Sequence, residues 1–280
     1  MFLVELAKLT RFEHALMLAF AVFIAETIVF GSIPIFTPVI ILSLLIPILS
    51  EMGSFALNDY FDIETDRKNK KKDRPLVNGK ISPKFALLFS IICLIGSTAY
   101  AFIISNTIFA IVLIFNLAAI LYNWKMKDLP LVGNIYIALT MALPFIFGNF
   151  VVSNSLTTMA IVLALLGFVA GLAREIIKSV QDMEGDRKAR GSKTLPIVIG
   201  KKPAMAIAII LYLLFIPLSA APFLFGLKFN LIAASLIVLA DIIIVFICYK
   251  TTNNKLKFAR DMSLVSFLLG MSGLFLASIL

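Results

Sequence analysis

The chain contains nine apolar runs that are each long enough to cross a membrane as a helix. A bilayer core about 30 Å thick needs about 20 apolar residues in a helix. The mean hydropathy of the 280-residue chain is +1.02 and 15% of its residues are charged, against about a quarter in soluble domains. We therefore predict an all-α polytopic membrane protein that forms one domain over residues 1–280. The predicted spans are residues 12–31, 37–57, 83–104, 107–124, 131–152, 157–178, 203–225, 229–249 and 259–279, within several residues at each end.

The positively charged residues lie almost entirely on one side of the predicted bundle. Of the 25 Lys and Arg residues, only Lys228 falls in a connection that nine spans would place opposite the N-terminus. Because cytoplasmic connections are enriched in Lys and Arg, we predict a cytoplasmic N-terminus and an external C-terminus. This asymmetry explains the net charge of +9 without a nucleic-acid partner. The run from Lys70 to Lys72 is expected to mark topology or to contact anionic lipids.

Two acidic clusters lie where predicted spans leave the membrane. Asn58, Asp62 and Asp66 follow the second span, and Asp182 and Asp186 follow the sixth. In each cluster two aspartates are four residues apart, so on a helix they share one face. Both clusters fall on the predicted cytoplasmic side. We therefore predict that they face each other across one site.

Carboxylates in this arrangement suit a magnesium ion. Mg²⁺ is a hard cation that is usually held by one or two carboxylates together with phosphate oxygens and water. Lys and Arg residues beside both clusters can donate hydrogen bonds to phosphate. With His14 as the single histidine, a zinc or haem site built from histidines is not expected. The pattern predicts a site for a metal-bound phosphate or diphosphate at the cytoplasmic mouth of an apolar bundle, where diphosphate is the leaving group.

Helical spacing extends the polar face of the second span into the membrane. Glu51, Phe55, Asn58 and Asp62 recur at intervals of three and four residues. Ionisable residues at this depth normally face the interior of a bundle. We therefore expect Glu51 to face the substrate, where it is the candidate for a general base.

Other interpretations of the clusters remain open at this point. A single charged loop is most often only solvated, whereas two clusters with matching spacing favour a site. A membrane alcohol phosphotransferase would carry the string D-G-x-x-A-R, which this sequence lacks. A cation transporter would place its acidic residues at mid-membrane, whereas the clusters lie at helix ends.

The two clusters also carry a family resemblance. The string N-D-Y-F-D-I-E-T-D at 58–66 resembles the first signature of the UbiA superfamily of intramembrane prenyltransferases, and D-M-E-G-D at 182–186 resembles the second. The strings D-R-P-L-x-x-G at 73–79 and T-L-P at 194–196 fit as well, and the likeness covers the whole chain. Within the superfamily the sequence is most similar to archaeal geranylgeranylglyceryl phosphate geranylgeranyltransferases.

The resemblance implies nine helices around a central cavity, with a cytoplasmic cap formed by the connections after the second and sixth spans. It implies that Mg²⁺ bridges Asp62, Asp66, Asp182 and Asp186 to a prenyl diphosphate, and that Asn58 belongs to the same catalytic set. It also implies diphosphate contacts from cationic residues near the motifs. These candidates are Arg67, Arg74, Lys178 and, less directly, Lys127.

The expected reaction transfers a geranylgeranyl group from its diphosphate to the free hydroxyl of geranylgeranylglyceryl phosphate. That transfer forms the second ether bond of archaeal membrane lipids. The partners implied are a prenyl diphosphate donor, a lipid-like acceptor and the membrane lipids, and the oligomeric state does not follow from the sequence. The alternative within the superfamily is an aromatic polyprenyltransferase that acts on 4-hydroxybenzoate or a quinone precursor.

Overall fold

The computed structural model describes residues 2–68 and 71–280, including every side chain in these ranges except those of Ala189 and Arg190. Lys70, from the basic run, therefore lies outside the described residues. Within the described ranges the chain is helical without strands, and nine helices are long and apolar enough to cross a membrane. The prediction of an all-α polytopic membrane protein is confirmed. The nine helices are α2 (Phe12–Phe30), α3 (Pro38–Phe61), α5 (Pro83–Ile104), α6 (Asn106–Trp124), α7 (Val132–Val152), α8 (Thr158–Arg190), α10 (Lys201–Ser219), α12 (Leu231–Thr252) and α13 (Leu256–Ile279).

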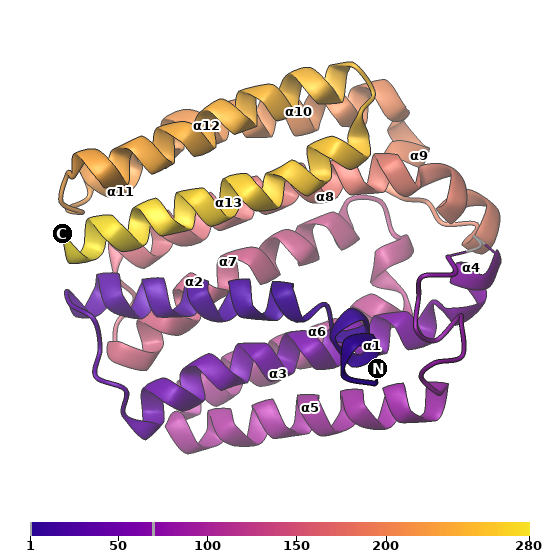
Figure 1. The fold of residues 1–280 in the computed structure, drawn as a ribbon, viewed down its shortest axis with the longest axis horizontal. Helices are drawn as coiled ribbons and strands as arrows, with labels where there is room; N and C mark the ends of the chain where they lie inside the picture. The colour runs from indigo at the N-terminus through magenta and orange to yellow at the C-terminus, as the bar shows by residue number, and fades with distance from the viewer. Residues whose placement is uncertain (1, 69–70) are drawn as a thin grey trace.

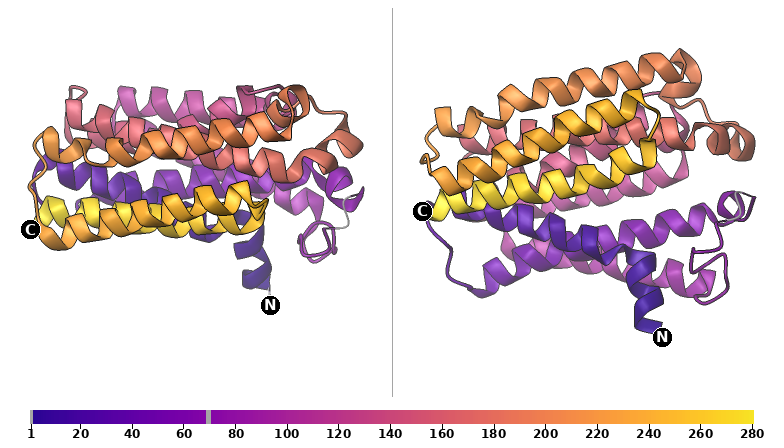
Figure 2. Two further views of the ribbon diagram at one scale, coloured as in Figure 1. Left: turned by 90° about the horizontal axis from the view of Figure 1, so that it is seen from above. Right: turned by 45° about the horizontal axis from the view of Figure 1, so that its top comes forward.

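The spanning helices run roughly parallel to one long axis and close into a ring (Figure 1). Consecutive spans pack side by side, and α13 also packs on α2, so the last helix meets the first span. The two additional views in Figure 2 show that the long helices share one direction. Apolar side chains such as Ile92, Leu213 and Ile242 are exposed on the outside of the ring, as expected for helices that face lipid.

Side-chain caps explain where several spans begin. Ser82, Ser105 and Thr157 each accept a hydrogen bond from the backbone N–H three residues further on, and Asn230 accepts two. Such caps satisfy donors that the first turn of a helix leaves without a partner. Each of these polar residues directly precedes an apolar run. The predicted start of each span therefore agrees with the structure to within three residues.

Small residues allow the helices to approach closely. A Cβ atom on Gly167 of α8 would lie 2.5 Å from the carbonyl oxygen of Met141 on α7. A Cβ atom on Gly273 of α13 would lie 2.9 Å from the carbonyl oxygen of Ala233 on α12. Helix association in membranes depends on this kind of close packing, because lipid provides no hydrophobic drive between helices.

The structure differs from the sequence-based expectation in three places. Helix α8 continues to Arg190, twelve residues beyond the predicted end of the apolar span, and this extension carries the second acidic cluster on a helix, as its i, i+4 spacing indicated. The seventh span divides into α10 and the short α11 (Ala221–Leu224). A further short helix, α1 (Phe2–Thr10), precedes the first span and turns away from it at Arg11, which has a positive φ of 45°. The cap therefore contains more helix than the sequence suggested.

The cap lies at one end of the ring. It is formed by α4 (Ile63–Lys68), η1 (Met126–Asp128), α9 (Leu195–Ile199) and the end of α8. The C-terminus lies at the opposite end of the bundle (Figure 1). Helix α4 contacts α8, which places the two acidic clusters at the same end of the molecule.

Candidate active site

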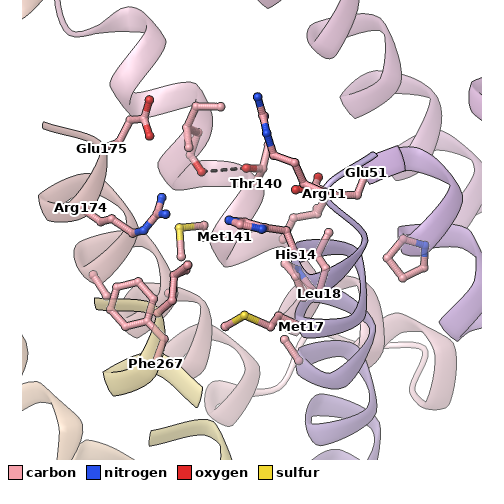
Figure 3. Close-up of a pocket in the computed structure, with 18 of the residues that line it drawn as sticks. Arg11, His14, Met17, Leu18, Glu51, Thr140, Met141, Arg174, Glu175 and Phe267 are labelled. Carbon is pink, nitrogen blue, oxygen red and sulfur yellow. Dashed lines mark hydrogen bonds between the residues drawn. The ribbon is translucent and has the colours of Figure 1, made fainter. Parts of the chain in front are cut away.

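A cavity of about 780 Å³ runs through the interior of the ring (Figure 3). Its volume lies in the range of roughly 300–1,000 Å³ that is usual for small-molecule sites. Along α8 it extends from Leu166 to Asp182, which is about 24 Å at a rise of 1.5 Å per residue. The inner part is lined mainly by apolar residues such as Met141 and Phe267, whereas charged residues gather toward the cap. The cavity can therefore take a long apolar chain that carries a charged head.

The first acidic cluster lies at a break in the helix. Helix α3 ends at Phe61, Asp62 caps it with φ −93° and ψ 1°, and α4 begins at the next residue. The backbone N–H of Asp66 still donates to the carbonyl of Asp62 at 2.7 Å, so the i, i+4 turn predicted from the sequence is retained. The break turns the chain away from the axis of α3 where it leaves the bundle.

Each aspartate of the first cluster faces a cation. The ammonium group of Lys127 donates to Asp62 Oδ1 at 2.5 Å, and both side chains are largely buried. Lys71 lies 3.0 Å from Asp66 Oδ1, and Arg74 Nε lies 3.8 Å from the other oxygen of Asp66. These side chains place positive charge against the carboxylates, where a metal ion would also be stabilised.

Asn58 is held by a residue that the sequence analysis did not identify. Its side-chain amide donates to Asn123 Oδ1 of α6 at 2.8 Å, and Asn123 in turn donates to the carbonyl of Ala119. Both asparagines line the cavity. The two asparagines are 65 positions apart in the sequence, and their pairing joins α3 to α6. Nothing near Asn123 in the sequence signals this contact.

The second cluster lies on an uninterrupted helix. Asp182 lines the cavity, and its carboxylate has no hydrogen bond or ion pair within the described part of the chain. Asp186 lies one turn further on, near the end of α8. Both clusters lie at the same end of the ring, because α4 contacts α8.

The carboxylates suit a shared metal ion better than a closed protein cage. Across residues 2–68 and 71–280 no three His, Cys, Asp or Glu side chains gather closely enough to hold a metal by themselves. Mg²⁺ commonly takes one or two carboxylates and completes its shell with substrate phosphate and water. The aspartates of the two clusters therefore fit a Mg²⁺ ion that is bound together with a phosphate group.

The predicted phosphate-binding cations differ in position. Arg74 and Lys178 line the cavity, and Lys178 pairs with Glu175 at 3.0 Å. Lys127 reaches Asp62 from η1, as described above. The Arg67 side chain is 52% exposed, pairs with Glu64 at 2.9 Å and is not among the residues that line the cavity. The structure thus brings all but Arg67 of these cations to the cavity or to the first cluster.

Glu51 lines the cavity on α3 near Arg11, as Figure 3 shows. This is the position that helical spacing indicated for it, one side of α3 shared with Asn58. The side chain therefore lies where it can meet a ligand in the cavity.

Asp59 is a buried residue that binds two arginines, and the spacing of the motif did not point to it. It is 2% exposed and binds Arg74 Nη1 with both oxygens, at 2.8 and 3.1 Å, and Arg11 Nη2 at 3.2 Å. Burial lowers the pKa of Arg11. Burial also opposes the charge of Arg74, but Asp59 and Asp66 outweigh it and raise the pKa of Arg74. Asp59 therefore ties the start of the first span to the connection after α4.

Comparisons with known proteins agree with the geometry. The UbiA prenyltransferase family profile matches residues 15–277. A digeranylgeranylglyceryl phosphate synthase of Archaeoglobus fulgidus is 34% identical over 279 residues, covering 95% of this chain and 92% of that protein. A protein of the same name from Methanococcoides burtonii is also 34% identical over 279 residues, covering 94% and 98%.

Solved structures share the fold. A structure described as giving insight into digeranylgeranylglyceryl phosphate synthase in membranes has a TM-score of 0.73 and 28% identity, over 98% of this chain and 99% of that one. A UbiA homologue from Aeropyrum pernix K1 has a TM-score of 0.78 at 19% identity, over 95% and 98%. A UbiA homologue from Archaeoglobus fulgidus bound to GPP and Mg²⁺ has a TM-score of 0.68 at 23% identity, over 96% and 99%. The last two show the fold alone. The chain, with its two aspartate clusters at the mouth of a helical ring, therefore belongs to the UbiA prenyltransferase family and is a polytopic membrane prenyltransferase.

Proposed function

We propose that this enzyme transfers a geranylgeranyl group from geranylgeranyl diphosphate to the free hydroxyl of geranylgeranylglyceryl phosphate. The product is the doubly alkylated glycerol phosphate of archaeal ether lipids. The observation that carries the proposal is the pair of aspartate clusters at the mouth of a long apolar cavity. Near-full-length similarity to proteins named digeranylgeranylglyceryl phosphate synthase supports this acceptor over an aromatic ring.

In this proposal the head of the donor binds between the clusters. Asp62, Asp66, Asp182 and Asp186 hold Mg²⁺ together with the diphosphate, and Asn58 belongs to the same set. Charge that develops on the leaving diphosphate would be neutralised by a metal ion held there. Lys127 and Lys71 lie against the first cluster and can add charge-assisted hydrogen bonds to the diphosphate. Arg74 and Lys178 supply further positive charge at the cavity wall, whereas Arg67 would have to turn inward to take part.

The proposed reaction breaks one bond and forms another at the same carbon. The bond between the first prenyl carbon and the diphosphate oxygen breaks, and the diphosphate leaves with the electron pair. The acceptor oxygen supplies the pair for the new ether bond and releases its proton. Glu51 lies in the cavity wall and is the proposed acceptor of that proton. Tyr122 and Tyr136 stack 4.9 Å apart in the same wall, where their ring faces can stabilise positive charge on the allylic carbon.

We also propose that the cap end faces the cytoplasm. The N-terminus and the active site would then lie on the cytoplasmic side and the C-terminus outside. The distribution of Lys and Arg supports this orientation, because Lys228 alone lies on the other side. A water-soluble thiol reagent applied to intact cells would test it with a cysteine placed at Lys228 and another at Lys72.

A substrate assay tests the proposed reaction. Purified protein is given labelled geranylgeranyl diphosphate with either the glycerol ether phosphate or 4-hydroxybenzoate, in Mg²⁺ or in excess chelator. We expect labelled product with the glycerol ether phosphate and Mg²⁺ only. Prenylated hydroxybenzoate in place of the diether would show that the proposed acceptor is wrong. Full activity in chelator would show that the reaction does not need the proposed metal.

A further inference from the structure

Arg174 lies in the cavity wall deeper than the two aspartate clusters. It precedes Asp182 by eight residues on α8, which is about 12 Å along the helix. Its Nε atom is enclosed and has no hydrogen-bond partner within residues 2–68 and 71–280. Figure 3 shows the side chain pointing from α8 past Met141 of the neighbouring α7 toward His14 of α2. Arg174 is therefore a membrane-embedded cation aimed into the cavity.

The other cations of the cavity wall are already neutralised. Each has a carboxylate within ion-pair distance, whereas Arg174 has none among the side chains that the structure describes. The pairs are Arg11 and Arg74 with Asp59, Lys71 with Asp66, Lys178 with Glu175, and Arg260 with Asp261.

An enclosed cation without a partner is unfavourable, so its presence points to a ligand. Ionisable residues inside a membrane bundle are normally functional for this reason. The planar guanidinium has a fork of donors that matches phosphate oxygens. The carboxylates of Glu175 and Asp261 and the cation Arg260 act on Arg174 from further away, but none of them lies within ion-pair distance of it in the described part of the chain. The ligand that fits is therefore a phosphate group attached to an apolar body.

The proposed reaction brings two such groups into one cavity. The diphosphate of the donor needs the metal and hence the aspartates at the mouth. A second phosphate needs its own cation, because two anions repel each other strongly in a medium of low dielectric constant. Resting on the proposed function, we infer that Arg174 binds the phosphate monoester of the acceptor. Arg174 thereby makes the enzyme select a phosphorylated glycerol ether over the free alcohol.

Kinetics with matched acceptors test this inference. The variants are Arg174→Met, which keeps the volume and removes the charge, and Arg174→Lys, which keeps the charge without the fork. Lys250→Met is the control, because Lys250 lies outside the cavity over the ring of Phe246. The rate constant kcat/KM is measured for the glycerol ether phosphate and for the same ether without phosphate, together with KM for the donor.

We expect the wild type to prefer the phosphorylated acceptor by about 10- to 100-fold, the range of a charged hydrogen bond. Arg174→Met should lose this preference, while donor KM and activity on the free alcohol stay within about twofold of the wild type. Arg174→Lys should keep part of the preference for the phosphorylated acceptor, and Lys250→Met should keep all of it. If Arg174→Met keeps the preference, the inference is wrong. If donor KM rises instead, Arg174 binds the diphosphate and the assignment to the acceptor is overturned.

A binding measurement separates this inference from the proposed function. Soluble glycerol 1-phosphate should raise the melting temperature of the detergent-solubilised wild type but not that of Arg174→Met. Without ligand, Arg174→Met should melt at or above the wild-type temperature, because an unpartnered cation has been removed; a lower value would indicate a structural role and contradict the inference. If the wild type alkylates neither glycerol ether, the proposed function fails. The glycerol phosphate shift then still decides whether Arg174 is a phosphate site.

Discussion

The two aspartate clusters are built on different local structures. The first lies where α3 breaks, and Asp59, Asp62 and Asp66 all contact Lys or Arg side chains. The second lies on α8, which continues for 33 residues, and the carboxylate of Asp182 has no partner within the described chain. Carboxylates of the first cluster therefore serve the folded state as well as the ligand, whereas Asp182 is available to the ligand alone. Substitutions in the two clusters should affect activity and stability differently.

Asp182→Asn should have the largest effect on catalysis. Loss of one ligand charge at a site that stabilises a leaving diphosphate should lower kcat/KM by about 100-fold or more. The melting temperature should stay at the wild-type value, since no contact of the carboxylate is lost. Glu184→Gln, at an exposed position on the same helix, is the control and should keep full activity. A large drop in melting temperature of Asp182→Asn would contradict the contrast between the clusters.

Asp59→Asn makes the same chemical exchange next to the first cluster and should mainly affect stability. It leaves Arg11 and Arg74 without their shared carboxylate, and breaking a buried pair of this kind costs about 3–5 kcal/mol. Thermal unfolding in detergent measures the difference from the wild type. Equal melting temperatures for Asp59→Asn and Asp182→Asn would show that the two clusters do not differ in this respect.

The smallest effect is expected from Glu5, which ties α1 to the connection that follows α4. Its carboxylate accepts from Lys80 at 2.7 Å, and this bond, with help from Lys8, lowers the pKa of Glu5 below its usual 4.5. Its contribution to stability is therefore complete above pH 4.5 and declines as the pH falls through the lower pKa of the folded state. The wild type should melt above Glu5→Gln at neutral pH, and the difference should shrink in acid. A difference that is constant with pH would argue against this ion pair.

The positions of the helices followed from the sequence because they depend on local chemistry. An apolar run has to form a helix in lipid, where each backbone polar group needs an internal partner. Its ends are set by residues such as Ser82 and Thr157, whose side chains cap the first turn. The end of α8 at Arg190 did not follow from hydropathy, because its last three turns are polar, although the spacing of Asp182 and Asp186 indicated a helical extension.

The candidate site divides in the same way. The i, i+4 spacing of Asp62 with Asp66 and of Asp182 with Asp186 was visible in the sequence, and the family membership it indicated is confirmed. The roles assigned to these aspartates remain predictions. The pairing of Asn58 with Asn123 and of Asp59 with Arg11 was not visible, because each joins residues at least 48 positions apart.

The sequence by itself determined which segments cross the membrane and which ends of them carry charge. It could do so because transfer of a segment into lipid depends on its own composition and length. Only the tertiary structure decided which charges neutralise each other. Ion pairing depends on distances between side chains from different helices, and these are set when the ring closes. That is why Asp59 is a structural anchor, Arg67 lies outside the cavity, and Arg174 faces into it with no carboxylate within ion-pair distance among the described residues.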